Sequence, residues 1–219
     1  LVPDRAAPPP VDHFAPWDWT DPFQAVNLCP WQQLALKGLG QAGDLGRQLD
    51  REMVDLIRLF GSATVTGSSG PARLPAGVGE IVALLAIDYR QVAERRTLAL
   101  RLRESADADA ALNALRQTLL RLRRLEARMG VTVLHAFDGH LARTDACIPT
   151  DLEAFLALGE VHTSEDLRRL LDLYRGDLLA DVDASGDLRT WLDTQRTRLR
   201  DRFIALATDG ARRVGGAIG

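Results

Sequence analysis

The pattern of apolar and polar residues predicts a small antiparallel sheet followed by helices. Residues 53–60 (MVDLIRLF) alternate well enough for a strand, and residues 63–66 continue as a second short strand before the turn GSSGP. Apolar residues at helical spacing then predict a helix that opens at Pro75 and ends near Tyr89. A second helix is expected over about residues 93–104, with leucines on one side and arginines on the other.

The third predicted helix, over about residues 107–129, has two chemically different faces. At about 100° per residue, apolar side chains form one stripe and a polar, arginine-rich face points the opposite way. The stripe consists of Leu112, Leu115, Leu119, Leu122, Leu125 and Met129. The opposite face carries Asn113, Gln117, Leu120 and Arg124, and it is flanked by Arg116, Arg121, Arg123 and Arg128.

A β-hairpin is predicted directly after this helix. The segment VTVLHAF (131–137) has strand character, and HLART (140–144) is the returning strand. Asp138 and Gly139 between them suit a type I′ turn, which joins antiparallel strands through two residues. A helix, a turn, a basic helix and a hairpin in this order indicate a winged helix-turn-helix domain.

The chain beyond residue 150 is predicted to be helical again. The segment DLEAFLAL forms a short helix, and Ser164 is expected to cap a longer one with leucines at helical spacing. The last helix, over about residues 187–214, has an apolar stripe that requires a partner helix. We expect part of that partner to lie outside this sequence or to come from another molecule.

Residues 1–52 form a separate region that is rich in proline, aspartate and aromatic residues. Its prolines exclude a continuous helix or a central strand, so an extended arm is expected, followed by short, broken helix. The aromatic residues of this region are Phe14, Trp17, Trp19, Phe23 and Trp31. Because such residues are unusual in a free linker, we expect the arm to pack along a domain surface or a neighbouring subunit.

Charge is distributed unevenly along the chain. The 219 residues have a formal net charge of −3, yet ten arginines and five acidic residues lie between residues 90 and 128. A basic segment in an otherwise acidic protein is typical of a DNA-binding module joined to a module that binds a protein partner. The alternative is a solvated helix face on which Arg121 and Arg128 pair with acids such as Glu126.

Composition and motifs favour a globular protein without a catalytic site. The hydrophobic content of 46% is enough for a core, and the sequence contains neither an apolar run that could span a bilayer nor a signal peptide. We therefore expect a cytoplasmic, nucleoid-associated protein. Common catalytic and phosphate-binding motifs are absent, the four histidines lack metal-ligand spacing, and Cys29 and Cys147 form no CxxC pair. No enzyme activity, metal or cofactor is expected.

Five stretches of this sequence together resemble the bacterial transcriptional activator domain. They are NALRQTLLRLRRL (113–125), FDGHL (137–141), IPTDLEAFLAL (148–158), LDLYRGDLLADV (171–182) and TWLDTQRTRLRDRF (190–203). The resemblance covers about residues 53–218 and implies a mainly α fold with small antiparallel β-sheets. As in SARP-type activators, an OmpR/PhoB-like winged helix (residues 53–149) would precede a tetratricopeptide-like helical domain (residues 150–219), here truncated.

The resemblance implies binding of double-stranded promoter DNA, with the third helix in the major groove. Asn113 and Gln117 suit adenine edges, and Arg116 or Arg124 suits guanine. Phosphate contacts are expected from Arg95, Arg96, Arg121, Arg123 and Arg128, and wing contacts to the minor groove or the backbone from His140 and Arg143. The family also implies a pair of molecules on direct repeats that recruits RNA polymerase through a subunit such as its sigma factor.

Three departures from the family pattern affect this interface. No Trp-Pro pair follows the second helix, Leu120 stands where a small polar residue is common, and His140-Leu141 replaces the usual Tyr-Arg of the wing. An exposed Leu120 suits a thymine methyl group, or it indicates that the face contacts a protein partner instead. The second interpretation is an interaction module that keeps the fold without specific DNA binding.

Overall fold

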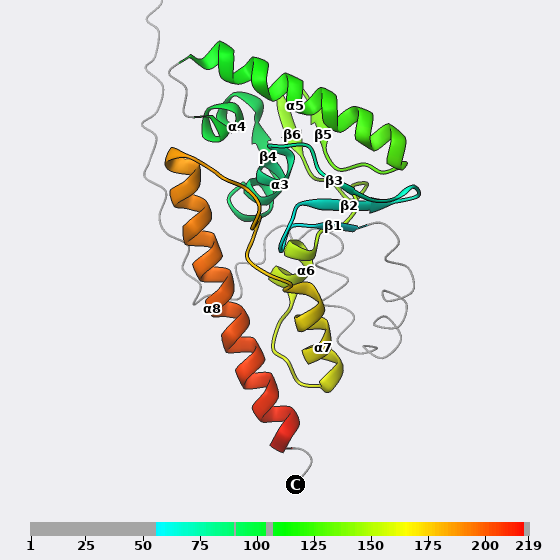
Figure 1. The fold of residues 1–219 in the computed structure, drawn as a ribbon, viewed down its shortest axis with the longest axis vertical. Coiled ribbons are helices and arrows are strands. Elements are labelled where there is room, and N and C mark those ends of the chain that lie inside the picture. The colour runs from blue at the N-terminus through cyan, green and yellow to red at the C-terminus, as the bar shows by residue number, and fades with distance from the viewer. Residues whose placement is uncertain (1–55, 90, 104–106, 217–219) are drawn as a thin grey trace, which may run out of the picture.

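Two small antiparallel sheets and six helices make up the described part of the chain, which comprises residues 56–89, 91–103 and 107–216 of a computed structural model (Figure 1). The fold is mainly helical with small antiparallel sheets, as predicted. The arm and broken helix expected over residues 1–52 lie outside the described residues, as does the beginning of the strand predicted from residue 53.

The first sheet has the order β1-β2-β3 and consists of Leu56–Arg58, Thr64–Gly67 and Gly70–Arg73. Strands β1 and β2 confirm the two predicted strands, and Ile57 lies opposite Val65 with both side chains fully buried. The sequence pattern does not predict β3, because GPAR contains the two residue types that strands usually exclude. As an edge strand it tolerates the missing backbone N–H of proline.

Three helices pack against one another beside this sheet: α3 (Val78–Ile87), α4 (Arg95–Leu102) and α5 (Ala108–Met129). The first of them confirms the helix expected after Pro75, and most of its side chains are fully buried. The second begins two residues later than predicted. The reason is that residues 92–94 (Val92–Glu94) form strand β4, which pairs with the hairpin.

Helix α5 confirms the third predicted helix at both ends. Asp107 accepts a hydrogen bond from the backbone N–H of Asp109 at 2.9 Å, and Gly130 ends the helix with a φ of 70°. The predicted apolar stripe faces the core: Leu115, Leu122, Leu125 and Met129 are buried, and Leu112 and Leu119 are half-buried.

The second sheet has the order β4-β6-β5 and contains the predicted hairpin, β5 (His135–Phe137) and β6 (His140–Ala142). Asp138 and Gly139 both have positive φ angles, 39° and 77°, as a type I′ turn requires. The first hairpin strand is shorter than predicted. Residues 131–134 are coil, because the Glu126 carboxylate, rather than a strand, accepts the backbone N–H groups of Val133 and Leu134.

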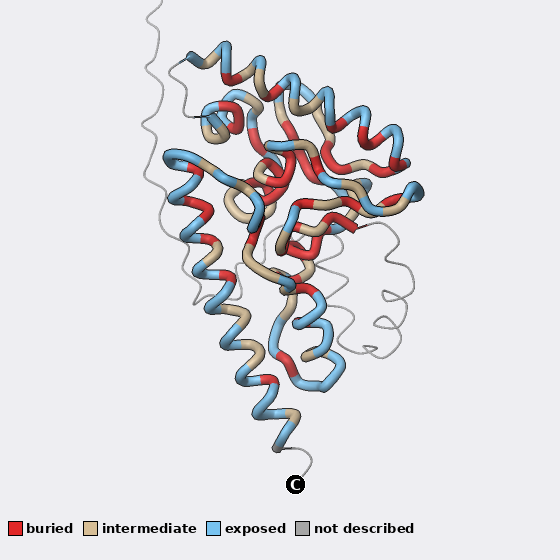
Figure 2. Tube along the Cα trace, in the orientation of Figure 1, coloured by how far each residue is buried: buried red, intermediate tan, exposed pale blue. Residues whose placement is uncertain are grey.

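The C-terminal part consists of α6 (Asp151–Ala157), α7 (Ser164–Leu173) and the long α8 (Gly186–Gly216). Thr163, and not Ser164 as predicted, caps α7, since its side chain accepts the backbone N–H of Asp166. Figure 1 shows α8 running from α4 down past α7, and both contacts involve buried side chains. Figure 2 shows that the buried residues of α8 lie mainly in its first half.

A short segment before α8 is bonded to the first sheet region. The backbone N–H of Gly61 donates to Asp177 O at 2.9 Å, and Leu179 and Ala180 return bonds to Leu59 O and Gly61 O at 2.8 Å each. Leu179 is fully buried and has a φ of 50°. One hydrophobic core therefore continues across the domain boundary expected near residue 150, and the boundary itself stays a prediction.

Candidate nucleic-acid interface

Helix α5 lies along one edge of the molecule with its polar face turned to solvent. Figure 1 shows it across the top of the fold, far from the C-terminal end of α8, and Figure 2 shows exposed and buried positions alternating along it. All predicted contact residues on this helix are exposed: Asn113, Arg116, Gln117, Leu120, Arg121, Arg123, Arg124 and Arg128. The whole face is thus accessible to another molecule. We call these eight residues the α5 face.

Two residues of the α5 face are joined in the free protein. Arg116 Nη1 donates a hydrogen bond to Asn113 Oδ1 at 2.9 Å, so both side chains are held in defined positions one turn apart. Gln117 is adjacent and forms no side-chain hydrogen bond with a described residue. Leu120 follows it and is 47% exposed, so an apolar side chain lies among the arginines of this face.

The arginines of the α5 face differ in their partners. Arg123 Nη1 lies 3.8 Å from Glu126 Oε2, whereas Arg121, Arg124 and Arg128 form no ion pair with a described residue. Glu126 is itself buried and accepts the backbone N–H groups of residues 133 and 134 at 2.7 and 3.2 Å. It therefore stabilises the chain after the helix instead of neutralising Arg121 and Arg128. Unpaired guanidinium groups on an exposed face are suited to phosphate contacts.

The tip of the hairpin lies beside the N-terminus of α4. The backbone N–H of Arg95 donates to Gly139 O at 2.8 Å, which fixes the turn against the helix. Arg96 is exposed, and Arg95 is half-buried with an Nε that has no hydrogen-bond partner among the described residues. His140 stacks on Phe137 with ring centroids 6.0 Å apart. Phe137, which the sequence pattern does not single out, is 46% exposed beside the type I′ turn.

Arg143 is not available to DNA, which corrects the wing contact predicted for it. Its Nε and Nη2 donate to the two carboxylate oxygens of Glu153 at 2.7 and 2.9 Å. The same guanidinium group also donates to Val133 O at 3.0 Å and Ile148 O at 2.7 Å. Its side chain is 4% exposed, because the chain leaves the wing after Ala142 and turns Arg143 into the protein.

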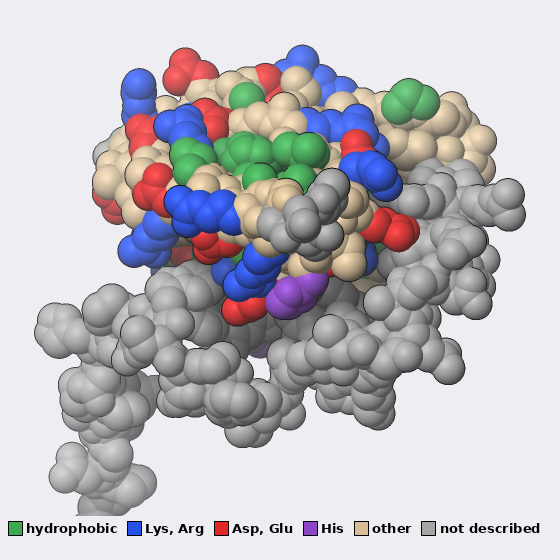
Figure 3. Space-filling view, turned by 90° about the horizontal axis from the view of Figure 1, so that it is seen from below, with side chains coloured by type: hydrophobic (Ala, Val, Ile, Leu, Met, Phe, Trp, Pro, Cys, Tyr) green, Lys and Arg blue, Asp and Glu red, His purple; other side chains and the backbone are tan. Residues whose placement is uncertain are grey.

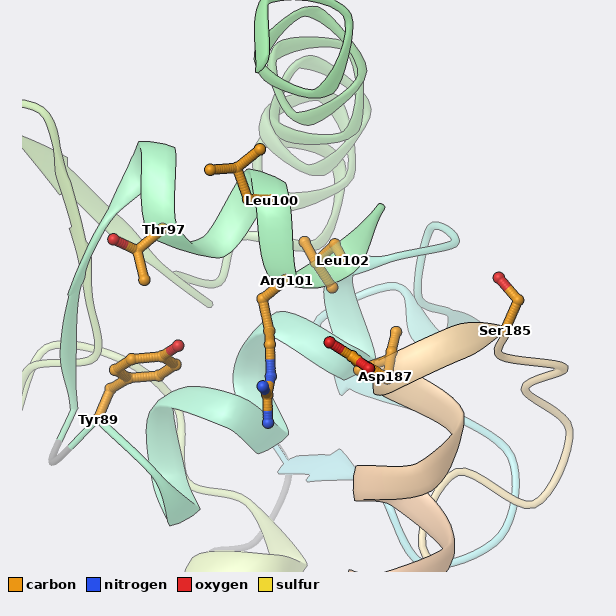
Figure 4. Close-up of a pocket in the computed structure, with 8 residues that line it drawn as sticks. Tyr89, Thr97, Leu100, Arg101, Leu102, Ser185 and Asp187 are labelled. Carbon is orange, nitrogen blue, oxygen red and sulfur yellow. The ribbon is translucent and has the colours of Figure 1, made fainter. Parts of the chain in front are cut away.

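A cavity of about 370 Å³ lies between α4 and the start of α8 (Figure 4). It is lined by Tyr89, Thr97, Leu100, Arg101, Leu102, Ser185, Asp187 and Leu188. Figure 4 shows Arg101 pointing into the space between Tyr89 and Asp187, and its Nη2 lies 4.0 Å from Asp88 Oδ2. Burial raises the pKa of Asp88. None of the lining residues is a cysteine or a histidine, so this lining lacks the usual nucleophile–base pair.

Two negative findings concern the described residues alone. No group of three or more His, Cys, Asp or Glu side chains there is arranged to hold a metal ion. Within the same ranges, no helix has the length and apolar character needed to cross a membrane. Cys147 carries a free thiol and is half-buried.

The fold is similar to that of EmbR from Mycobacterium tuberculosis, whose structure was determined in complex with a low-affinity phosphopeptide. The TM-score is 0.55 over 73% of this chain, at 21% sequence identity. The chain spans 45% of the length of EmbR. The sequence matches no family model and no curated protein significantly. The comparison therefore shows that the arrangement of the winged helix and the following helices occurs in a known protein.

Proposed function

We propose that this protein is a sequence-specific DNA-binding transcriptional regulator. The observation that carries the proposal is the two-sided helix α5, which turns one stripe of leucines toward the core and exposes amide and guanidinium groups along the other side. The similarity in fold to EmbR, a SARP-family regulator, supports the same function. The chemistry of the α5 face agrees with DNA binding, because its amide and guanidinium groups donate and accept hydrogen bonds.

Base reading is assigned to the middle of the α5 face. An α-helix fits the major groove of B-DNA, where amides pair with adenine and guanidinium groups pair with guanine. Asn113, Gln117 and Arg124 lie on one side of the helix. Gln117 follows Asn113 by four residues, about one turn, and Arg124 follows Gln117 by seven, about two turns. The bond between Arg116 and Asn113 would be exchanged for bonds to base edges on binding.

Positioning on the phosphate backbone is assigned to the flanking cations. Arg121, Arg123 and Arg128 belong to the α5 face and lie on either side of its amides, and Arg96 is exposed at the start of α4. Contacts of this kind fix the register of the protein on DNA without reading sequence. They also make affinity fall steeply with salt, because each neutralised phosphate releases counterions.

The helical part is assigned to protein contacts near the promoter. By analogy with SARP-type activators, it would contact RNA polymerase or its sigma factor, and two molecules would occupy direct repeats side by side. The acidic balance of the chain outside residues 90–128 suits contacts with proteins better than contacts with DNA.

The test is capture of genomic DNA by the full chain, followed by footprinting of the best site and titration at several salt concentrations. We expect an enriched sequence and a log–log salt slope of several units, at about 0.9 per phosphate contact. Arg124→Ala should weaken binding about tenfold or more, whereas Arg169→Ala, an exposed arginine on α7, serves as the matched control. Absence of any enriched sequence, or equal losses in both variants, would contradict the proposal.

A second candidate function is a protein–protein interaction module, and the observation that favours it is Leu120. A large apolar side chain in the middle of a polar helix face is typical of a protein contact. Leu120→Arg separates the candidates. It adds a positive charge, so non-specific DNA binding should increase while binding of a protein partner to an apolar contact should be lost. A co-purified protein that the variant no longer retains, without any enriched DNA, would favour the interaction module.

A further inference from the structure

The cavity between α4 and the start of α8 contains two opposite charges that are not bonded to each other. Arg101 and Asp187 both line it, and neither a hydrogen bond nor an ion pair joins them. Figure 4 shows the two side chains bordering the same space, which we call the α4–α8 cavity. Its volume of about 370 Å³ lies within the range of small-molecule sites, roughly 300–1,000 Å³.

The guanidinium group of Arg101 lacks acceptors. It forms no hydrogen bond with a described residue, and its Nη2 lies 4.0 Å from Asp88 Oδ2, which is too long for a hydrogen bond. Its Nε is shielded from solvent and also has no partner among the described residues. Such a group is costly to leave unbonded and often marks the place of a water molecule or a ligand. A carboxylate that entered the cavity would supply acceptors.

Asp187 offers the opposite charge, and hydroxyl groups lie around both. Asp187 belongs to the first turn of α8, is exposed, and forms no ion pair with a described residue. The hydroxyl groups of Tyr89, Thr97 and Ser185 line the same cavity. Burial raises the pKa of Tyr89, so its hydroxyl group keeps its proton near neutral pH. The lining therefore both donates and accepts hydrogen bonds.

The charges around the cavity are balanced, and this decides the class of ligand. Asp88 lies beside Arg101, and the positive charge of Arg198 acts on Asp88 in turn. A simple anion would meet Asp187 and Asp88, and a simple cation would meet Arg101. Figure 3 shows acidic and basic side chains interspersed on the face seen from below, so that face adds no strong field of one sign. The balance favours a zwitterion.

Apolar side chains complete the lining. They belong to Leu100, Leu102 and Leu188, of which Leu188 is buried, Leu102 is half-buried and Leu100 is exposed. An aliphatic group packed on them would remove apolar surface from water, which favours binding. A carboxylate, an ammonium group and an aliphatic side chain are combined in the aliphatic α-amino acids.

We propose that the α4–α8 cavity binds a free L-α-amino acid with an aliphatic side chain. Its carboxylate would pair with Arg101, its ammonium group with Asp187, and its side chain would pack on the leucines of the lining. Because the cavity lies where α4 meets the start of α8, the ligand would contact both the winged helix and the helical part. The proposal does not depend on DNA binding, since the lining contains no residue of the α5 face.

The test is isothermal titration calorimetry of the full chain with L-leucine as the probe. We expect saturable binding of one molecule per chain, and weaker binding of glycine, which lacks the apolar side chain. Leucinamide lacks the carboxylate, and isocaproate lacks the ammonium group. Each should bind about tenfold or more weakly than L-leucine, because each loses a hydrogen-bonded charge.

Two variants assign the two ends of the ligand. Arg101→Gln should weaken L-leucine about tenfold or more and leave leucinamide unchanged, because leucinamide has no carboxylate to lose. Asp187→Asn should weaken L-leucine to a similar extent and leave isocaproate unchanged. Since Asp187 is exposed, this variant tests the site even if Arg101→Gln fails to fold. Arg103→Gln and Asp183→Asn are matched controls, exposed and outside the lining, and should bind L-leucine like the wild type.

Four outcomes would overturn the proposal. The first is a wild type that shows neither heat of binding nor a higher unfolding midpoint with L-leucine, L-isoleucine or L-valine, which would leave water as the occupant. Equal affinities for L-leucine and leucinamide would indicate a cation site, and equal affinities for L-leucine and isocaproate an anion site. The fourth is a loss in the control variants as large as that in Arg101→Gln and Asp187→Asn.

Discussion

Arg143 and Glu153 form a buried, two-pronged ion pair that joins the end of the wing to the first turn of α6. Glu153 also forms a capping box with Thr150. The backbone N–H of Thr150 donates to the Glu153 carboxylate at 3.0 Å, and the backbone N–H of Glu153 donates to the Thr150 hydroxyl at 2.9 Å. The Glu153 carboxylate thus bonds both Arg143, which follows the wing, and Thr150, which caps α6. Its loss would leave a guanidinium group buried without a counter-charge.

Replacing Arg143 should destabilise the protein strongly. Arg143→Ala leaves the Glu153 carboxylate buried and unpaired, and we expect a loss of about 3–5 kcal/mol in the free energy of unfolding, measured by urea denaturation. The double variant Arg143→Met, Glu153→Leu should recover a large part of this loss, because neither charge remains. Arg175→Ala removes an exposed ion pair 3.9 Å long and should cost less than about 1 kcal/mol. Equal effects of Arg143→Ala and Arg175→Ala would refute the structural role.

Asp151 should make stability depend on pH between about 4 and 7. Burial raises its pKa from 3.8 to about 6, although the backbone N–H groups of Leu59 and Phe60 donate to the carboxylate at 2.7 and 3.1 Å. The folded protein therefore holds this proton more tightly than the unfolded chain does. The contribution of the group is greatest near pH 4 and decreases by about 3 kcal/mol as the pH rises through 6.

The variant that tests this pH dependence is Asp151→Asn, because an asparagine side chain does not titrate. Unfolding free energies of the wild type and the variant, measured by urea denaturation at several pH values, should differ increasingly in favour of the wild type as the pH falls. Glu80 and Asp88, whose pKa values burial also raises, are present in both proteins and cancel in the difference. A difference that is constant from pH 4 to 7 would show that Asp151 keeps its ordinary pKa.

Two glycines of α8 should respond oppositely to the same substitution. A Cβ on Gly210 would overlap Val161, lying 2.8 Å from its Cβ, whereas a Cβ on Gly215 would meet no atom within 4 Å. Gly210→Ala should therefore lower stability by about 1–3 kcal/mol, while Gly215→Ala should be neutral or stabilise by up to about 1 kcal/mol through helix propensity. Thermal unfolding measures both. Val161→Ala combined with Gly210→Ala should restore part of the loss, and additive losses would contradict the close contact.

Residues of the α5 face should separate into two classes in DNA binding. Gln117→Ala should cost about 1–3 kcal/mol for the best site and relax the preference at one base position. Arg128→Ala should weaken all sequences about equally and reduce the salt slope by about 1. Both are measured by fluorescence anisotropy with the footprinted site and single-base variants of it. A uniform loss in Gln117→Ala would remove this residue from base reading.

The sequence predicts those features that depend on neighbours along the chain. The spacing of leucines places α5 and its exposed side, and Asp138-Gly139 specifies the turn of the hairpin, because both follow from local backbone geometry. The pattern Thr150-x-x-Glu153 is likewise a local sign of a capping box. Local rules therefore give the element order and the α5 face of the candidate site.

What the sequence does not predict depends on long-range partners. Arg143 and Glu153 are ten residues apart, and no local rule distinguishes a wing arginine that points outward from one that binds a carboxylate. Strand β3 forms because β2 lies beside it, against the preferences of its own glycine and proline. The coil at residues 131–134 results from Glu126, whose charge alone suggested pairing with arginines of its own helix.

The backbone bonds between residues 59–61 and 177–180 have a consequence for the proposed DNA binding. These bonds fix the segment before α8 to the first sheet, so helices α7 and α8 would not rotate relative to α5. If α5 binds DNA, the position of the binding site therefore sets which way α7 and α8 point around the DNA axis. Moving the site by about 5 base pairs, half a turn of B-DNA, would turn these helices away from a promoter-bound partner. Moving it by a full turn would bring them back. The proposed function therefore predicts that activation would oscillate with the helical phase of the DNA site, which a reporter series with the site moved in single base pairs would measure.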